Sequence, residues 1–232
     1  MTKYYTVDEL RQNKELARSI RDEFSNNTWF KDIEEFWQKL GKIIKENKKI
    51  LDVGCGSGFI ASEMTKRYNL DRKNFYLIDI DNYLIFPENK GMNFFSSDIS
   101  FSKLPFANDS FDIVLSSQVI EHLENPFNYL REIERVLKPG GYFILSLPNG
   151  WNIFSRFLFL FKGKIEGWHK DNNHITFLPR DVFWRFLKNY QVIDIVGQPR
   201  KRGWLPPFCW FDFNYPRNEF FSQKVCYYLR KK

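Results

Sequence analysis

A short apolar run followed by three closely spaced glycines constrains the fold of this chain more than any other feature. Residues 49–53 read KILDV, and glycine then occupies every second position, at Gly54, Gly56 and Gly58. Residues 59–68 have the apolar spacing of a helix. Glycines between a strand and a helix let the backbone turn tightly and bring the main chain close to a ligand. Such a unit is typical of α/β folds.

The same alternation of strands and helices recurs downstream. Strands are expected at 75–80, 92–95, 111–115 and 142–147, a helix at 126–137 and a turn at 138–141. Continuously apolar strands joined by amphipathic helices form a parallel sheet that is covered on both faces. The sequence therefore predicts a doubly wound α/β fold, in which ligands bind beyond the carboxyl ends of the strands.

The flanking regions are less regular. Residues 7–46 have helical spacing that is interrupted near 26–28, which predicts two helices. After Pro148 we expect a bulky apolar stretch at 151–161, a polar one at 162–173, a helix at 181–188, a strand at 192–196, an irregular insertion at 199–221 and a closing strand at 223–229.

We divide the chain into two parts. N-terminal helices over 1–46 are expected to cap the site. One domain over 47–232 is expected to carry aromatic-rich insertions at about 151–190 and 199–222.

Composition argues against several other classes of protein. The 232 residues carry a formal net charge of +7, which favours an anionic partner or a solvated basic surface. Cys55, Cys209 and Cys226 form no CxxC pair, so neither a disulfide framework nor a structural zinc site is indicated. No stretch approaches the roughly 18 apolar residues of a membrane span, and no secretory signal is recognisable. We expect a cytoplasmic protein without a metal.

The glycine loop does not match the common phosphate-binding patterns. A dinucleotide fingerprint requires its third glycine where Phe59 stands, and no G-K-S/T follows for a P-loop. The negative charge of Asp52 opposes a pyrophosphate but suits a ligand that carries an ammonium and a sulfonium. Asp79 ends the next strand, near the roughly 20-residue offset at which a carboxylate binds ribose hydroxyls. These residues indicate a nucleoside ligand without phosphate.

Four motifs, in order, resemble those of the class I S-adenosylmethionine-dependent methyltransferases, in particular the subgroup with ubiquinone-type and small-molecule methyltransferases. They are ILDVGCGSGFIA, FYLIDID, FSSDISFSKLPFANDSFDIVLSSQVIEHL and RVLKPGGYFILSLPN. The final QKVCYYLRKK is similar to the antiparallel last strand of that family. The resemblance implies a Rossmann-like, mostly parallel seven-stranded sheet with the order 3-2-1-4-5-7-6.

The resemblance also implies a donor and the residues that hold it. The donor is S-adenosyl-L-methionine, and S-adenosyl-L-homocysteine is the product. By position, Gly54, Gly56 and Gly58 would lie under the methionine and ribose portions, Asp52 near the ammonium group and Asp79 on the ribose hydroxyls.

The remaining donor contacts are implied at the next strand ends. Asp98 would accept a hydrogen bond from the adenine amino group, with the Ile99 backbone nearby. Ser117 and Gln118, at the end of the fourth strand, would border the methionine portion.

Methyl transfer from a sulfonium is an in-line displacement, so much of the acceleration comes from positioning, and no metal is required. A hydroxyl acceptor benefits from a base, for which histidine has a suitable pKa. We interpret His122, just after the fourth strand, and His174, before a helix, as candidate bases. Similar family segments place a residue like His174 beside the substrate cavity. Glu121 could orient either histidine or cap a helix, and capping is the favoured expectation. His169 is expected to lie in a solvated loop.

The aromatic-rich segments leave the acceptor open. The stretch at 151–161, with Lys162, Lys164 and the basic tail at 230–232, suits a lid or a membrane-contacting helix, or else a core or dimer-interface helix. Residues 199–204 mix basic and aromatic side chains but match no RNA-binding module.

We predict a methyltransferase acting on a small or lipid-like acceptor, preferably at oxygen. The alternatives are a non-catalytic S-adenosyl ligand-binding or regulatory protein and an RNA methyltransferase. Nucleic acid is the less favoured partner, and the oligomeric state is left open.

Overall fold

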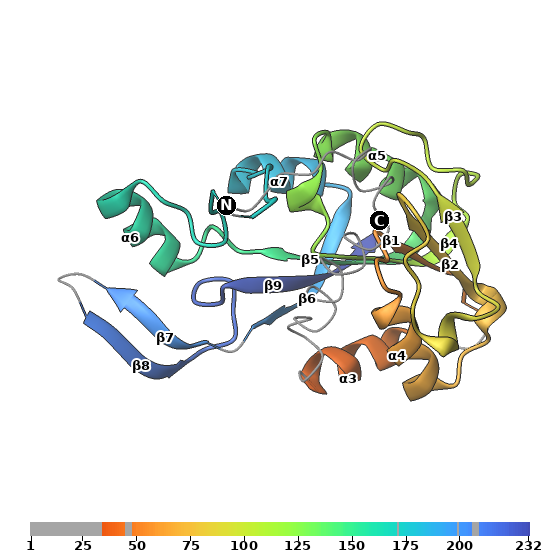
Figure 1. Ribbon diagram of the computed structural model, residues 1–232, viewed down its shortest axis with the longest axis horizontal. Helices are drawn as coiled ribbons and strands as arrows, with labels where there is room; N and C mark the ends of the chain where they lie inside the picture. Colours follow the sequence, from red (N-terminus) through yellow and green to blue (C-terminus); the bar gives the residue numbers. More distant parts are fainter. Residues whose placement is uncertain (1–33, 45–47, 171, 199, 206–208) are drawn as a thin grey trace.

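The computed structural model describes residues 34–44, 48–170, 172–198, 200–205 and 209–232 (Figure 1). The first of the two N-terminal helices predicted from the sequence falls outside these residues. The second is present as α3, Glu34–Ile43. Whether the N-terminal segment caps the site stays a prediction.

One seven-stranded sheet forms the centre of the protein, with the order β3-β2-β1-β4-β5-β9-β6. Its strands are β1 Ile50–Val53, β2 Phe75–Asp79, β3 Asn93–Ser96, β4 Phe111–Ser117, β5 Leu137–Pro148, β6 Tyr190–Gly197 and β9 Lys224–Lys231. Neighbours from β3 to β5 pair in parallel, whereas β9 is antiparallel to both β5 and β6. With β9 counted as the seventh strand, the predicted order 3-2-1-4-5-7-6 is confirmed.

Helices cover both faces of the sheet, as the apolar strands require. All four residues of β1 are buried. On one face lie α3 and α4, Phe59–Tyr68; on the other lie α5, Pro126–Val136, and α7, Arg180–Phe186 (Figure 1). Two hydrophobic cores result, one on each side of the sheet.

Local sequence explains where α5 begins and which side it buries. The side chain of Asn125 accepts a hydrogen bond from the Asn128 amide at 3.1 Å, and Pro126 occupies the first turn, where its missing N–H costs nothing. Ile133 and Val136 are fully buried on the side facing the sheet, and burial of each side chain contributes about 1.5–3 kcal/mol.

Two segments differ from the predictions. The turn expected at 138–141 lies inside β5, because Leu137 already pairs with Phe111 and the register shifts between Phe111 and Ile113. The insertion expected to be irregular contains an antiparallel hairpin, β7 Arg200–Leu205 and β8 Cys209–Tyr215. Its prolines suggested irregular structure, but the aromatic sequence of β8 favours a strand.

The bulky apolar stretch forms α6, Ile153–Lys162. The side chain of Asn152 accepts a hydrogen bond from the Ser155 amide at the start of the helix, and Gly163, with φ 62°, ends it. The helix contacts β7, and both extend beyond the sheet past β5 and β9 (Figure 1). Within the part of the chain that the structure describes, no helix has the length and apolar content needed to span a membrane.

Candidate active site

The glycine loop after β1 turns through three left-handed residues. Gly54, Gly56 and Gly58 have φ angles of 70°, 51° and 77°, a region in which a side chain costs free energy. The amides of Gly54 and Cys55 donate to the Ile78 carbonyl at 2.8 and 3.2 Å. The loop is therefore attached to the end of β2.

The three glycines have different surroundings. A Cβ atom on Gly54 would lie 2.5 Å from Val119, and one on Gly58 would lie 2.0 Å from the side-chain nitrogen of Asn89. A Cβ atom on Gly56 would have no neighbour within 4 Å. Gly54 and Gly58 thus allow close packing, whereas Gly56 faces open space that a ligand can occupy.

Asp79 is held at the end of β2 by the same loop. Its carboxylate accepts hydrogen bonds from the amides of Gly56 and Ile80, both at 2.7 Å. These two bonds fix the orientation of the carboxylate at the strand end.

Asp52 is a buried carboxyl that lacks a full set of partners. It is 1% exposed, and its Oδ2 atom has no hydrogen-bond partner among the described residues. Burial, and then the charge of Asp79, raises the pKa of Asp52 to about 7. A buried acceptor without a donor is costly, and an ammonium group that reached Oδ2 would relieve that cost.

The loop after β3 brings Asp98 to the same edge of the sheet. The Ser100 amide donates to Oδ1 of Asp98 at 2.9 Å, which orients the carboxylate. The Ser97 amide donates to the Asp79 carbonyl at 2.8 Å, which ties this loop to β2. Ile99 is partly buried and packs against a hydrophobic core.

The end of β4 has a constrained backbone. The hydroxyl oxygens of Ser117 and Ser146 lie 2.9 Å apart. Gln118 has φ 55°, uncommon for a residue with a side chain, and its amide donates to the Ser146 carbonyl at 2.9 Å. Strain of this kind costs about 1–3 kcal/mol and clusters at functional sites. The next residue, Val119, lies against Gly54.

Every residue predicted to hold the donor therefore lies at or next to the carboxyl ends of β1 to β4. Their direct contacts with the donor stay predictions. Sequence reasoning missed Val119 and Asn89, which pack against the glycine loop from later segments. Val119 lies within the third motif, but nothing in that motif marks its contact with Gly54, and Asn89 lies outside all four motifs.

Glu121 follows β4 in a short 3-10 helix, Ile120–His122. The cap predicted for it is wrong: the side chain of Asn125 caps α5, and neither carboxylate oxygen of Glu121 has a hydrogen-bond partner among the described residues. Glu121 is 2% exposed, and burial raises its pKa to about 8. Its carbonyl accepts from the amides of Ile175 and Thr176 at 2.9 and 3.0 Å.

These backbone bonds bring the two predicted bases together. The rings of His122 and His174 lie 4.8 Å apart, edge to face. Nδ1 of His122 is 3.0 Å from the Asn173 carbonyl oxygen, and Nδ1 of His174 is 2.6 Å from that of Gly167. Because a carbonyl only accepts, Nδ1 carries the proton in both rings and Nε2 carries the lone pair.

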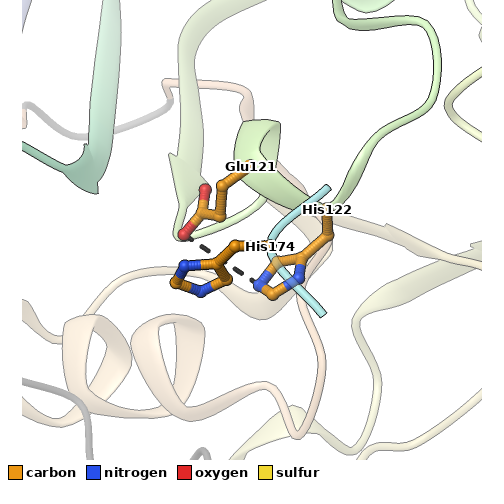
Figure 2. A group of neighbouring side chains, drawn as sticks. All are labelled: Glu121, His122 and His174. Atoms are coloured by element: carbon orange, nitrogen blue, oxygen red, sulfur yellow. Dashed lines mark ion pairs between the residues drawn. The ribbon is translucent and has the colours of Figure 1, made fainter. Parts of the chain in front are cut away.

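Burial keeps both rings neutral. It lowers the pKa of His122 to about 4, with the nearby His174 adding to the effect, and it also lowers the pKa of His174. Figure 2 shows the carboxylate of Glu121 and the two imidazoles gathered together. Their potential ligand atoms all lie within 4.8 Å of one another, so this group could hold a metal ion. His169 is exposed, as predicted.

An aromatic-lined cavity lies behind Glu121. It has a volume of about 10 Å³, enough for roughly one water molecule, and its walls include Ile120, Trp151, Trp168 and Phe177. A larger open depression of about 380 Å³, lined in part by Asp109, Arg135 and Lys231, lies near the amino-terminal end of β4, away from these groups.

Tyr129 connects the two sides of the site. Its hydroxyl donates to Ser116 Oγ on β4. Burial raises the pKa of Tyr129, and the charges of both Glu121 and Asp52 add to that increase. The buried carboxyl near the glycine loop and the one near the histidines therefore act electrostatically on one hydroxyl.

Comparison with known proteins agrees with this arrangement. Residues 51–145 match the family model described as a methyltransferase domain. A probable S-adenosylmethionine-dependent methyltransferase of Mycolicibacterium smegmatis is 29% identical over 145 residues, covering 57% of this chain and 50% of that protein. A ubiquinone biosynthesis O-methyltransferase of Rickettsia bellii is 29% identical over 150 residues, covering 62% and 61% respectively. The chain thus spans half to three-fifths of the length of these relatives.

The fold is also found among solved structures. A SAM-dependent methyltransferase from Archaeoglobus fulgidus superimposes with a TM-score of 0.58 at 20% identity, covering 86% of this chain and 93% of that one. S-Adenosylmethionine is the cofactor of such methyltransferases, and two features fit it: the open space at Gly56 next to the Asp79 carboxylate, and the unpartnered oxygen of Asp52. Residues 51–145 therefore form a methyltransferase domain, and in sequence and strand order the chain is similar to the class I S-adenosylmethionine-dependent methyltransferases.

Proposed function

We propose that the protein transfers a methyl group from S-adenosylmethionine to an oxygen atom of a small or lipid-like acceptor. The observation that carries the proposal is the loop at Gly56, open on one side and flanked by the carboxyls of Asp52 and Asp79. Two carboxyls and no basic side chain at this turn suit a cationic nucleoside rather than a phosphate.

Each carboxyl has a distinct task in this proposal. Asp52 would receive the donor's ammonium group at its unpartnered Oδ2 atom. Asp79, already oriented by two amides, would bind the ribose hydroxyls. Asp98, oriented by Ser100, would accept from the adenine amino group. The donor supplies an activated methyl carbon, and these side chains fix its direction.

The acceptor would enter beside Glu121, His122 and His174. Trp151, Trp168 and Phe177 in the wall of the neighbouring cavity would contact an apolar portion of the acceptor, and the cavity of about 10 Å³ would have to widen to admit it. Transfer to oxygen is also supported by the R. bellii relative, which carries the name of an O-methyltransferase. A neutral histidine with its lone pair on Nε2 can accept the hydroxyl proton, which is the role predicted for His174 and His122. That role stays a prediction.

An anionic lipid surface would adjoin α6. Phe159, Leu160 and Phe161 are 60%, 73% and 57% exposed, and Lys162 and Lys164 follow them on exposed positions. Apolar side chains next to lysines are typical of helices that lie on anionic membranes. A lipid-like acceptor would be delivered from such a surface.

Calorimetric titration of the purified protein with S-adenosylmethionine, S-adenosylhomocysteine and NAD tests the donor assignment. We expect the first two to bind, and Asp79→Asn to weaken them by about 10–100-fold, because a hydrogen bond to a charged group contributes about 1.5–3 kcal/mol. Asp81→Asn is the matched control, since Asp81 bonds only to the neighbouring Asn82 amide among the contacts described.

A preference for NAD, or equal affinity in the Asp79 and Asp81 variants, would contradict the assignment. Mass spectrometry of hydroxyl compounds incubated with labelled donor then tests transfer. Donor binding without transfer to any acceptor would favour the non-catalytic alternative, and transfer to RNA with affinity falling steeply as salt rises would favour the RNA enzyme.

A further inference from the structure

We propose that Glu121, His122 and His174 form a binding site for a divalent first-row transition-metal ion, with Zn²⁺ as the probe. The site stands on its own geometry, and only its role rests on the proposed function. The ion would take one carboxylate oxygen and the Nε2 atom of each ring, leaving at least one coordination position open toward the acceptor.

The first argument is the convergence of three donor atoms. Glu121 and His122 come from the segment after β4, and His174 comes from the segment before α7. Two backbone hydrogen bonds to the Glu121 carbonyl hold these segments side by side. The potential ligand atoms lie within 4.8 Å of one another, and His122 Nε2 is 4.0 Å from Glu121 Oε1 (Figure 2).

Only small side-chain rotations would complete the site. A tetrahedral ion with ligand bonds of about 2.1 Å holds its donor atoms about 3.4 Å apart. The atoms of this cluster, now within 4.8 Å of one another, would have to approach by up to about 1.4 Å, a shift that rotation about side-chain bonds can supply.

The second argument is the orientation of the imidazoles. In metal sites, a ligating histidine commonly donates its other ring N–H to a backbone carbonyl or carboxylate, which fixes the tautomer and the ring direction. Both rings have such a bond here, from His122 to Asn173 and from His174 to Gly167. Each is thereby in the tautomer in which Nε2 can coordinate a metal.

The third and independent argument is the carboxyl of Glu121. It is 2% exposed, and both oxygens lack a hydrogen-bond partner among the described residues. A carboxyl buried without partners costs several kcal/mol in protein interiors, so such a group needs an explanation. A bound cation would pair with the charged carboxylate and remove that cost.

The donor set points to the kind of ion and its role. Two imidazole nitrogens and one carboxylate oxygen suit zinc and its first-row neighbours, whereas magnesium and calcium prefer oxygen alone. Three protein ligands with an open position are typical of catalytic rather than structural sites. An acceptor hydroxyl at the open position would lose its proton to water more readily, because the cation stabilises the negative oxygen. In this metal-bound form the Nε2 atoms of both rings hold the ion, so the metal replaces the histidines in promoting that loss.

Metal binding to the protein freed of metal tests the site without any donor present. After dialysis against a chelator, Zn²⁺ titration by calorimetry should show one equivalent bound, and Co²⁺ should give visible absorption bands of a nitrogen–oxygen site. Glu121→Gln and His174→Gln should each lower the affinity for Zn²⁺ at least about 100-fold. Loss of a residue that binds the metal directly should exceed the 10–100-fold effect of losing a residue that only hydrogen-bonds to a ligand.

His169→Gln is the matched control, because His169 is exposed and outside the cluster; it should bind Zn²⁺ like the wild type. S-Adenosylmethionine titrations of each variant show whether the donor site is still folded. Failure of wild-type protein to bind one equivalent, or equal binding by all variants, would overturn the metal site and leave the donor assignment untouched. Failure of donor binding alone would overturn the proposed function while the metal site remained.

Discussion

At the scale of single residues, the burial of Asp52 couples stability to pH. An aspartate carboxyl titrates near pH 3.8 in an unfolded chain, whereas Asp52 titrates near pH 7 in the folded protein. Between these values the folded state keeps a proton that the unfolded state has lost. Raising the pH from 4 to 7 therefore lowers the free energy of unfolding.

Asp52→Asn removes this titration. Without donor, we expect the variant's Tm to rise relative to wild type as the pH increases from 4 to 7, by at least about 5 °C, and the difference to stay constant above pH 7. Thermal unfolding followed by fluorescence across this pH range measures the difference. A difference in Tm between variant and wild type that does not vary with pH would show that the buried charge of Asp52 does not cause that difference.

The glycine loop allows a second test, in which two substitutions separate packing from ligand binding. Gly58→Ala should lower stability by more than about 2 kcal/mol, because the new Cβ would collide with Asn89 and Leu84 and add backbone strain. Gly56→Ala should cost only the strain of its positive φ, about 1 kcal/mol, and should weaken donor binding instead. Denaturant unfolding and donor calorimetry on both variants check the pair; the reverse pattern would refute it.

At the scale of elements, α6 is divided into a packed and an exposed half. Phe154 and Ser155 are buried, while the side chains from Phe159 to Phe161 are largely exposed. The prediction of a core helix therefore holds only for the first turn of α6. For the exposed half, contact with lipid and contact with a second subunit both stay predictions.

The double substitution Phe159→Ser with Leu160→Ser should weaken binding to phosphatidylglycerol vesicles at least about 10-fold, since each apolar side chain contributes about 1.5–3 kcal/mol when buried. Tm should change little, because both side chains are exposed. Vesicle sedimentation measures binding, with phosphatidylcholine vesicles as the uncharged control. Wild-type protein that bound neither kind of vesicle would refute lipid contact by α6. Loss of a dimer in the variant would identify α6 as a protein contact.

The elements also show the limits of local patterns. Strands and helices from β1 to α5 end within a few residues of their predicted ends, because apolar periodicity and caps act within one turn or strand. The prolines of residues 199–221 predict irregular structure, whereas the aromatic residues of β8 form a hairpin with β7. The predicted cap at Glu121 is wrong because closeness to a helix in the sequence does not reveal whether a carboxyl accepts a hydrogen bond there.

At the scale of the whole molecule, β9 is the strand that connects the edge strand β6 to the parallel part of the sheet. It pairs with β5 on one side and β6 on the other, and Tyr228 donates from its hydroxyl to the Phe36 carbonyl on α3 at 2.9 Å. Without β9, β6 would lose its sheet partner. Both hydrophobic cores would also lose buried side chains from this strand.

Ending the chain after Gln223 should therefore prevent native folding, although fewer than a tenth of the residues are removed. We expect loss of cooperative thermal unfolding and of near-ultraviolet circular dichroism. Removal of Lys232 alone is the control, because that residue lies beyond β9. A truncated protein that unfolded cooperatively near the wild-type Tm would show that β9 is dispensable.

The succession of strands, the glycine turn and the acids at the strand ends can be predicted from the sequence, because each follows from residues adjacent in the chain and parallel strands bring their ends to one edge. Folding in three dimensions sets which glycine faces open space and which carboxyls are buried without a full set of hydrogen bonds. It also decided that two histidines 52 residues apart in the chain face one glutamate. Such relations depend on contacts between distant segments, and no local pattern of residue types records them.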